Sequence, residues 1–465
     1  MRRWLWPALA AAAFVLYNVQ HWWDAPGDDW SSIWVGAAMV AGGRADLLYT
    51  IDPDRFTDVG DPAAWSAFAE VVGRQTLGHP YVHEPGFAYA LSVLAGPGSW
   101  STSLHVLLVL DVLALVGITW IVGRTWAPVL LQPVPFAVTL LVLSLSEPVR
   151  YGLWLGQTTP LILLLTIGAV ALARRHPVLA GLLLAIPVSI KITPVLIAGW
   201  WLLDRRRRTA LLGLLGGLAG LALVQLVLVD RSVVTAFVTA LRHVQRTTTT
   251  GFSNQSLIAW LEDLHVTDPQ GSYPTLEVTG WVSALSTGLL VVVVVAVLSR
   301  AVRMQRAGID AERFAAAGLL TASLPFTSLS WTHYCVLLLV PAAVLVSAAR
   351  SGAGRWPYLA VAVLVALNMQ PLAVDGPSNL ATPDVLIRSH LLAALVALVA
   401  VLALPARVWG QAAARPDAED GAGTSPVTEP LTPIATTRDD GAPGAPDPVV
   451  PSPPAPLVTQ GRSLG

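Results

Sequence analysis

The sequence predicts an all-α, polytopic integral membrane protein with about 11–12 transmembrane or re-entrant helices. Of its 465 residues, 54% are hydrophobic and only 12% are charged, against about 25% charged in an average soluble protein. The mean hydropathy is +0.62, and the apolar residues occur in many runs of membrane-spanning length. These properties exclude a large soluble core as the main architecture.

The N-terminal segment, residues 1–23, has a basic start and an apolar centre, which is typical of an uncleaved signal anchor when many spans follow. Arg2 and Arg3 place the N-terminus in the cytoplasm, because basic residues stay on the inner side of the membrane. Residues 24–103 follow as a polar loop that contains Gly and Pro. Its length predicts an extracytoplasmic region with a function of its own.

Apolar runs bordered by arginines predict the remaining spans. We expect spans at about 104–123, 128–146, 158–173, 209–229, 277–299, 314–329, 333–349, 357–374 and 387–406. The arginines at their ends place the loops 230–276, 328–333 and 375–386 outside the cell. Residues 411–465 are rich in Pro, Ala, Gly, Thr and Asp, which predicts a disordered cytoplasmic tail after a membrane-embedded domain of residues 1–410.

One apolar run, residues 178–203, differs from the others. Arginines border both of its ends, so both ends are expected in the cytoplasm. The run is too short for two crossings, because one crossing takes about 20 residues. Pro187 and Pro194 divide it, which predicts a short re-entrant hairpin that lines a cavity or is buried in protein. Lys191 lies at the tip of this hairpin.

Lys191 is the only lysine in the chain. An ammonium group inside a membrane segment is costly unless it reaches water or an anion. A lysine that only snorkels lies near a helix end at the interface, whereas Lys191 is far in sequence from both arginine clusters. A contact to the phosphate of a lipid substrate is therefore expected at this position.

Other polar residues map to the outer side of the predicted topology. They are Asp28, Asp29, His83, Glu84, Gln157, Asn254, Gln255 and His333. Asp29 is either the N-cap of a helix or a general base on an acceptor hydroxyl. His333 is either an interfacial histidine in an aromatic belt with Trp331 and Tyr334, or a hydrogen-bonding partner of a sugar or phosphate.

The sequence lacks the motifs that are typical of several other classes of protein. The chain has no P-loop and no dinucleotide-binding glycine pattern, so it is not expected to drive transport with a nucleotide. The net charge is −1, and no nucleic-acid partner is expected. The single cysteine, Cys335, excludes an internal disulfide, and the nine histidines are scattered, so no metal site or cofactor is expected.

Five motifs, in order, resemble glycosyltransferase family 87, the polyprenol-phosphate-mannose-dependent alpha-mannosyltransferase type with the GT-C fold. They are Asp29-Trp30 with Ala37-Ala38, Gly43 and Leu48-Tyr49; Gly156-Gln157; Ala180-Gly181 with Lys191-Ile192-Thr193-Pro194; Asn254-Gln255-Ser256-Leu257; and Ser330-Trp331-Thr332-His333. Two positions depart from the pattern. His83-Glu84-Pro85 stands where the family has Tyr-Pro-Pro, and Tyr334 stands where a second histidine is common.

The resemblance implies a hexosyltransferase that moves a sugar, expected to be mannose, from a polyprenyl-phosphate-linked donor to a lipid-linked or polysaccharide acceptor. Asp29 would be the general base of an inverting transfer. Lys191, His333 and Gln157 would bind the donor or its phosphate. The residues that would position the acceptor or another part of the substrate are Asn254, Gln255, Asp28, His83, Glu84 and Trp331. The enzyme would act on the extracytoplasmic face of a bacterial plasma membrane, in cell-envelope biosynthesis, with both termini in the cytoplasm.

Other functions remain open at this point. The transferred sugar is alternatively arabinofuranose from the same kind of donor. A lipid flippase or secondary transporter would also have broken helices and an intramembrane charge. Against transport, the polar residues gather on one face, and the sequence has no internal repeat. A non-catalytic membrane scaffold would leave Asp29 and Lys191 without a role.

Overall fold

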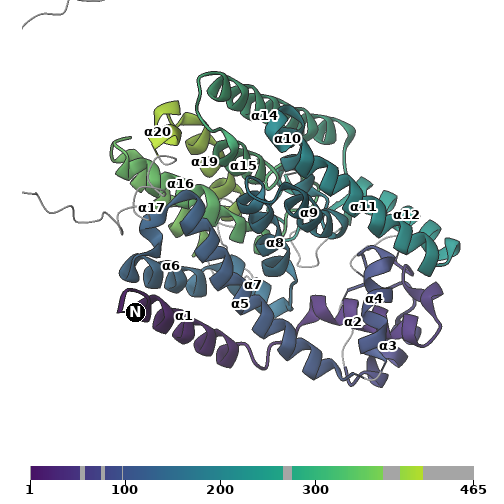
Figure 1. The fold of residues 1–465 in the computed structure, drawn as a ribbon. Helices are drawn as coiled ribbons and strands as arrows, with labels where there is room; N and C mark the ends of the chain where they lie inside the picture. Colours follow the sequence, from purple (N-terminus) through teal and green to yellow (C-terminus); the bar gives the residue numbers. More distant parts are fainter. Residues whose placement is uncertain are drawn as a thin grey trace, which may run out of the picture. The chain divides into compact units, whose positions relative to one another are not determined.

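The computed structural model describes residues 2–52, 58–74, 79–96, 98–264, 275–369 and 388–411. All of them belong to one compact unit, residues 1–416. Helices hold 77% of the structure, which confirms the predicted all-α class (Figure 1). The two short strands, β1 (Thr247–Thr249) and β2 (Thr275–Glu277), pair antiparallel. The predicted loop at 375–386 and the predicted tail beyond Gln411 lie outside the described residues.

Several helices are suited to a membrane. In the described part of the chain, four are long and apolar enough to cross one: α5 (Trp100–Trp126), α11 (Arg208–Leu228) with the turn η4 (Arg205–Arg207), α14 (Gly280–Arg306), and η5 (Thr332–Leu338) with α16 (Leu339–Arg350). A fifth span would be formed by α6 (Pro133–Leu145) and α7 (Glu147–Leu155), which are bent by 58°. Shorter apolar helices are α4 (Pro85–Ala95), α8 (Thr159–Leu172), α9 (Pro177–Ile190), α10 (Leu196–Leu203) with η3 (Thr193–Val195), α17 (Trp356–Asn368) and α19 (Ser389–Ala403). The chain is a multi-pass membrane protein.

The remaining elements are shorter or more polar. They are α1 (Arg2–His21), α2 (Asp28–Ala41), η1 (Ala45–Leu47), α3 (Pro62–Val71), η2 (Pro128–Leu131), α12 (Arg231–Arg246), α13 (Leu257–Asp263), α15 (Glu312–Ala322) and α20 (Ala406–Gln411). The main core lies among α5, α8, α9, α15, α16 and α19. A second core, with Trp30, Trp65 and Tyr81, holds α2, α3 and α4 against the start of α5.

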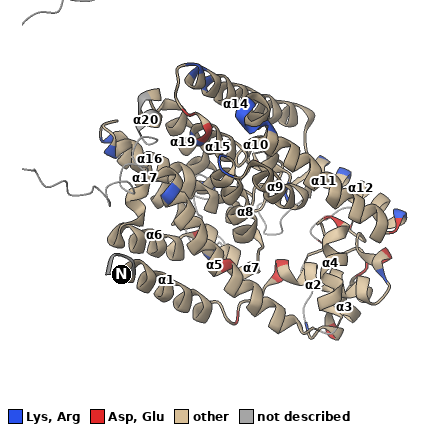
Figure 2. Cartoon of the chain, viewed as in Figure 1, with Lys and Arg blue, Asp and Glu red and all other residues tan. Residues whose placement is uncertain are grey.

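The outer faces of two long helices are apolar and uncovered. Within their most apolar stretches, only 11% of α11 and 17% of α14 is buried by the rest of the chain, compared with 56% of α5. Such faces are stable against lipid and not against water. Figure 2 agrees with this placement, because the bodies of α11 and α14 are nearly free of charged residues.

Residues 178–203, for which a re-entrant hairpin is predicted, contain two short helices, α9 and α10, separated at Lys191 and Ile192. Pro187 lies inside α9, and Pro194 lies in the η3 turn. The chain leaves the helical conformation at Lys191, whose backbone is extended (φ −137°, ψ 107°). The helix break therefore brings the lysine to the end of α9 and away from its apolar sides.

The position of α9 depends on a close backbone contact with α11. A Cβ atom at Gly181 would lie 2.0 Å from the carbonyl oxygen of Ala210, and one at Gly213 would lie 2.4 Å from that of Val178. Small residues at such a crossing let helices in a membrane approach until their backbones touch. The glycine of the Ala180-Gly181 motif therefore serves the packing that holds α9.

We predict that Gly213→Ala lowers the thermal stability of the detergent-solubilised protein, because the added methyl group overlaps the backbone of α9. The expected cost is roughly 1–3 kcal/mol. Gly220→Ala is the control, since nothing lies within 4 Å of a Cβ at that position in the same helix. The control should be neutral or slightly stabilising. Equal melting temperatures for the two variants would contradict the contact.

Candidate functional site

A cavity of about 630 Å³ opens beside the first loop. It is lined by Asp28, Asp29, Asp58, His79, Val82 and His83 from this loop, by Tyr151, Trp154, Leu155 and Gln157 from α7 and the turn after it, by Lys191, and by Val244, Thr249, Ser253, Leu329, Trp331, His333 and Tyr334 from later segments. The cavity thus brings together most of the residues that the sequence singled out. The exceptions are Glu84, Asn254 and Gln255.

Lys191 enters the cavity from the break between α9 and α10. Its Nζ donates a hydrogen bond to Thr159 Oγ1 (2.7 Å) and lies 3.9 Å from the ring centre of Tyr334. Thr159 Oγ1 in turn donates to Gln157 Oε1 (3.3 Å). Neither neighbour of the ammonium group carries a negative charge, and no carboxylate forms an ion pair with it among the described residues. Lys191 therefore has donor capacity left for a ligand in the cavity.

Two left-handed glycines bring the start of α2 against the end of α7. Gly27 (φ 61°) precedes α2, and Gly156 (φ 67°) follows α7. A Cβ at Gly156 would lie 3.3 Å from the Cα of Gly27 and 3.0 Å from the Cβ of Trp30. Any other residue at Gly156 would be strained by this conformation and crowded by this contact. The glycine of the Gly156-Gln157 motif therefore places Gln157 and the carboxylates of α2 at one cavity.

Asp28 and Asp29 are the first two residues of α2, and the N-cap is Gly27. The N-cap interpretation of Asp29 is therefore wrong, because the chain needs a left-handed residue where the helix begins. Each of the two carboxylates has its own cation from the same loop. Arg74 pairs with Asp28. His79 contacts Asp29 Oδ1 through its Nε2, and the side chain of Asp29 is 13% exposed.

His79 is a site residue that the sequence analysis missed. Its Nδ1 faces the carbonyl oxygen of Pro80 (3.0 Å) while its Nε2 faces Asp29, so both ring nitrogens must donate and the ring is an imidazolium. Burial lowers the pKa of His79, but the charge and hydrogen bond of Asp29 outweigh this effect and raise the pKa to about 9. His79 therefore faces Asp29 as a cation at neutral pH.

His333 is almost fully buried, at 2% exposure, yet neither ring nitrogen has a hydrogen-bond partner in the part of the chain that the structure describes. The ring lies between those of Tyr151 and Tyr334, with centre distances of 6.0 and 4.7 Å. Buried polar atoms without partners are rare in folded proteins. Since His333 lines the cavity, a ligand is the natural partner of these nitrogens.

His83 and Glu84 are adjacent in sequence, but their side chains have different surroundings. His83 lines the cavity, and burial together with the charges of Lys191 and His79 lowers its pKa to about 3. Its ring is therefore neutral over the physiological range. Glu84 precedes α4 and is not part of the cavity lining. Burial raises the pKa of its carboxyl group, despite a hydrogen bond from the backbone of Gly86.

Asn254 and Gln255 lie behind the cavity wall. The Nδ2 of Asn254 donates to the carbonyl oxygens of Thr249 (2.9 Å) and Ser328 (3.1 Å), and its Oδ1 accepts from the backbone nitrogen of Ser330 (2.9 Å). Gln255 is 1% exposed, and its Nε2 donates to the carbonyl oxygen of Phe252 (2.5 Å). In this structure their side chains bind protein groups and do not reach the cavity.

Asn254 also joins two motifs that lie far apart in sequence. Its backbone forms an antiparallel bridge with Trp331, and Thr332 donates from its nitrogen to the carbonyl oxygen of Ser253 (2.8 Å). The segment that carries Trp331 and His333 is therefore fastened to the segment around Asn254. The amide of Asn254 pairs with chain groups on both sides of this junction.

Besides His79, sequence reasoning missed Thr159 and the aromatic pair Tyr151 and Trp154. Thr159 carries a weak signal, because it is a polar residue two positions after Gln157 at the start of an apolar run. The rings of Tyr151 and Trp154 are nearly parallel (17°) on the cavity wall. No local signal marks His79, which is fifty positions from Asp29. Within the described ranges, no group of three or more His, Cys, Asp or Glu side chains is arranged to hold a metal ion.

Comparison with known proteins identifies one family. The family model of glycosyltransferase family 87 matches residues 81–327, which is more than half of the chain. The matched range includes Gln157 and Lys191, begins after Asp29 and ends before His333. No curated protein and no solved structure gave a significant match.

The pairing of His79 with Asp29 predicts a pH-dependent stability. The pKa of His79 in the folded protein is above its ordinary value of 6.5, so the pair stabilises the fold fully below pH 6.5, and this contribution is lost as the pH rises through about 9. The shift corresponds to at most about 3 kcal/mol, and solvent around the ring, which is 30% exposed, reduces this figure. Thermal melting of the wild type and of His79→Gln should differ below pH 6.5 and converge above pH 9. A pH-independent difference would contradict the ion pair.

Proposed function

The chain belongs to glycosyltransferase family 87, and on that premise we propose that it transfers mannose from a polyprenyl-phosphate-linked donor to a lipid-linked or polysaccharide acceptor at the extracytoplasmic face. Membership of the family makes it a membrane glycosyltransferase with a lipid-linked sugar donor and an acceptor. The position of Lys191 carries the proposal. Its ammonium group enters a cavity that also holds carboxylates, and the group has no ion-pair partner among the described residues.

The donor phosphate is assigned to the end of the cavity around Lys191. The ammonium group supplies the charge, and Thr159 fixes its position. Thr159 is also the first residue of α8, and a helix N-terminus favours an anion. His333, with two unpaired ring nitrogens, is placed to donate a hydrogen bond to a phosphate oxygen or a sugar hydroxyl. Such groups act best on charge that develops as the leaving group departs.

The acceptor is assigned to the end of the cavity around Asp29. Oδ1 of this carboxylate is held by His79, while no described residue bonds to Oδ2. A carboxylate held in this way is oriented, and its second oxygen is open to an acceptor hydroxyl, as a general base requires. Asp28 is paired with Arg74 and is less suited to accept a proton.

The reaction is a single displacement. The acceptor hydroxyl oxygen attacks the anomeric carbon of the donor while the bond from that carbon to the phosphate oxygen breaks. Asp29 takes the hydroxyl proton, and polyprenyl phosphate leaves with its charge facing Lys191. Attack from the side opposite to the leaving group inverts the anomeric configuration. The extracytoplasmic placement rests on the arginine distribution.

We predict that Asp29→Asn lowers transfer of radiolabelled mannose from a polyprenyl-phosphate donor by roughly 10²–10⁴-fold, as expected for loss of a general base. Asp46→Asn is the matched control, because Asp46 is in the same loop, is 62% exposed and pairs only with Arg44 among the described residues. Asp46→Asn should melt like the wild type, and Asp29→Asn should stay folded but melt at a lower temperature at neutral pH, because it loses the ion pair with His79. Undiminished transfer by Asp29→Asn would refute the assignment, and lipid scrambling in vesicles without any transfer would favour a flippase.

We predict that Lys191→Gln lowers kcat by roughly 10²–10³-fold, because the leaving phosphate loses its compensating charge. The donor KM should change less, since Lys191 acts mainly on charge that develops during the reaction. Arg175→Gln removes the same charge from an exposed position outside the cavity and serves as the control. Steady-state kinetics at varied donor concentration measure both constants. Equal kcat values in the two variants would contradict the role of Lys191.

A further inference from the structure

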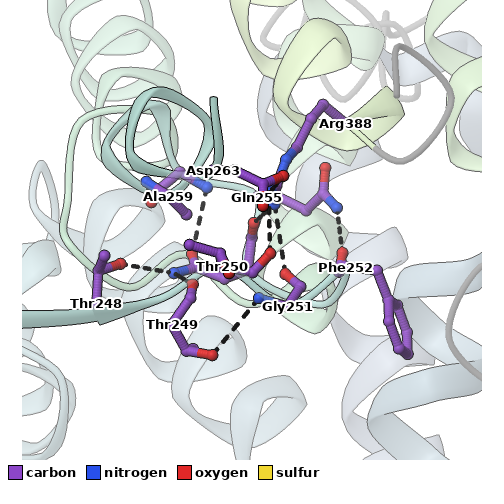
Figure 3. A network of polar contacts seen from close by, with 11 residues as sticks. Thr248, Thr249, Thr250, Gly251, Phe252, Gln255, Ala259, Asp263 and Arg388 are labelled. Atoms are coloured by element: carbon purple, nitrogen blue, oxygen red, sulfur yellow. Dashed lines mark hydrogen bonds and ion pairs between the residues drawn. The ribbon is translucent and has the colours of Figure 1, made fainter. Parts of the chain in front are cut away.

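Arg388 is a buried arginine directly before α19, and its side chain is 3% exposed. Its Nη1 donates to the carbonyl oxygen of Asn254 (2.6 Å) and more weakly to that of Gly251 (3.3 Å). Its Nη2 donates to the carbonyl oxygen of Thr250 (2.9 Å) and to Asp263 Oδ2 (2.8 Å) (Figure 3). One guanidinium group therefore binds three backbone carbonyl oxygens of one short segment, residues 250–254.

We propose that Arg388 is a positioning residue of the transfer site: it sets the shape of the cavity wall formed by residues 249–254 and, through this wall, the place of Trp331 and His333. This inference rests on the proposed function. Arg388 does not line the cavity itself, so it acts through the backbone that it holds.

The buried carbonyl oxygens of the segment are best satisfied by an arginine side chain. Buried carbonyl oxygens that point toward one place need donors, since an unpaired buried carbonyl is costly. The planar guanidinium group offers several N–H donors in a fixed fork, so it reaches three carbonyls and a carboxylate at once. A lysine has a single ammonium centre and cannot span the same acceptors.

Hydrogen bonds run in both directions between the region of the segment and the start of α19. While Arg388 donates to the segment, Gln255 Oε1 accepts a hydrogen bond from the backbone nitrogen of Leu391, in the first turn of α19 (3.2 Å). The first turn of a helix has nitrogens without partners inside the helix, so Gln255 caps α19 from outside. Hydrogen bonds in both directions therefore hold the segment and the adjoining Gln255 against the start of α19.

The contact continues to the residues of the cavity. Ser253 in the segment and Thr249 directly before it both line the cavity. The carbonyl oxygen of Ser253 accepts hydrogen bonds from the nitrogen and the hydroxyl of Thr332 (2.8 and 3.1 Å). Thr332 lies between Trp331 and His333, which both line the cavity. A shift of the segment therefore moves both side chains.

Arg300 provides a comparison within the same chain. It also donates to two backbone carbonyls, those of Leu402 and Leu404, and packs on the ring of Phe314 (5.0 Å). None of these partners lines the cavity. Removing Arg300 should therefore affect stability alone, whereas removing Arg388 should affect stability and transfer.

The test compares Arg388→Gln, Arg388→Lys and Arg300→Gln as purified full-length proteins. We expect Arg388→Gln and Arg388→Lys to lower kcat by roughly 10–100-fold, the effect of a misplaced reacting group. Arg300→Gln should lower the melting temperature similarly and leave kcat unchanged. Asp263→Asn should also keep kcat, because the carbonyl bonds of Arg388 remain. Wild-type kcat in either Arg388 variant would overturn the proposal. If Arg388→Gln does not fold, the kcat of Arg388→Lys is the deciding measurement.

A second readout does not depend on catalysis. Diethyl pyrocarbonate modifies accessible imidazoles, and mass spectrometry gives its rate at His333 relative to exposed His176 in the same protein. The rate at His333 should change in the Arg388 variants and stay at the wild-type value in Arg300→Gln. An unchanged rate in all variants would overturn the proposal. Absence of transfer by the wild type, together with a changed rate at His333, would count against the proposed function alone.

Discussion

The burial of Lys191 without an ion-pair partner among the described residues is the constraint that the structure around the cavity accommodates. An ammonium group between two apolar helices is costly unless dipoles, a π face or an anion surround it. Thr159 Oγ1 and the ring of Tyr334 provide the first two, and the cavity leaves room for the third. The backbone contact between α9 and α11 holds the helix that ends at this lysine. A partly compensated cation is thus built into the wall, which suits an anionic ligand.

The opposite charge comes from a distant part of the sequence. Two left-handed glycines, Gly27 and Gly156, lie so close that a side chain at Gly156 would press on Gly27, and they bring the start of α2 to the turn that carries Gln157. Asp29 then lies in the same cavity as Lys191, while His79 holds one of its two carboxylate oxygens. Because the two charges are held by separate elements, each can face a different substrate, which is what a transfer between two molecules requires.

Much of the fold and part of the site could be predicted from sequence. Long apolar runs with arginines at their ends indicated an all-α membrane protein, and helices such as α5, α11 and α14 confirm that class. The motif residues around Gly156, Lys191 and Trp331 were visible as patterns. Patterns do not distinguish a side chain that faces a ligand from one that braces the chain. Asn254 shows this, since its amide binds backbone groups on both sides of a junction.

By itself, the sequence determined the class of protein, the family, and the helix break at Lys191, because hydropathy, motif order and proline positions are local properties. Only the tertiary structure decided which polar residues share a cavity. His79 meets Asp29, and Arg388 meets the carbonyls of Thr250 and Asn254, across separations that no local pattern encodes. Such pairs form because buried charges and buried carbonyls must find partners wherever packing brings them together.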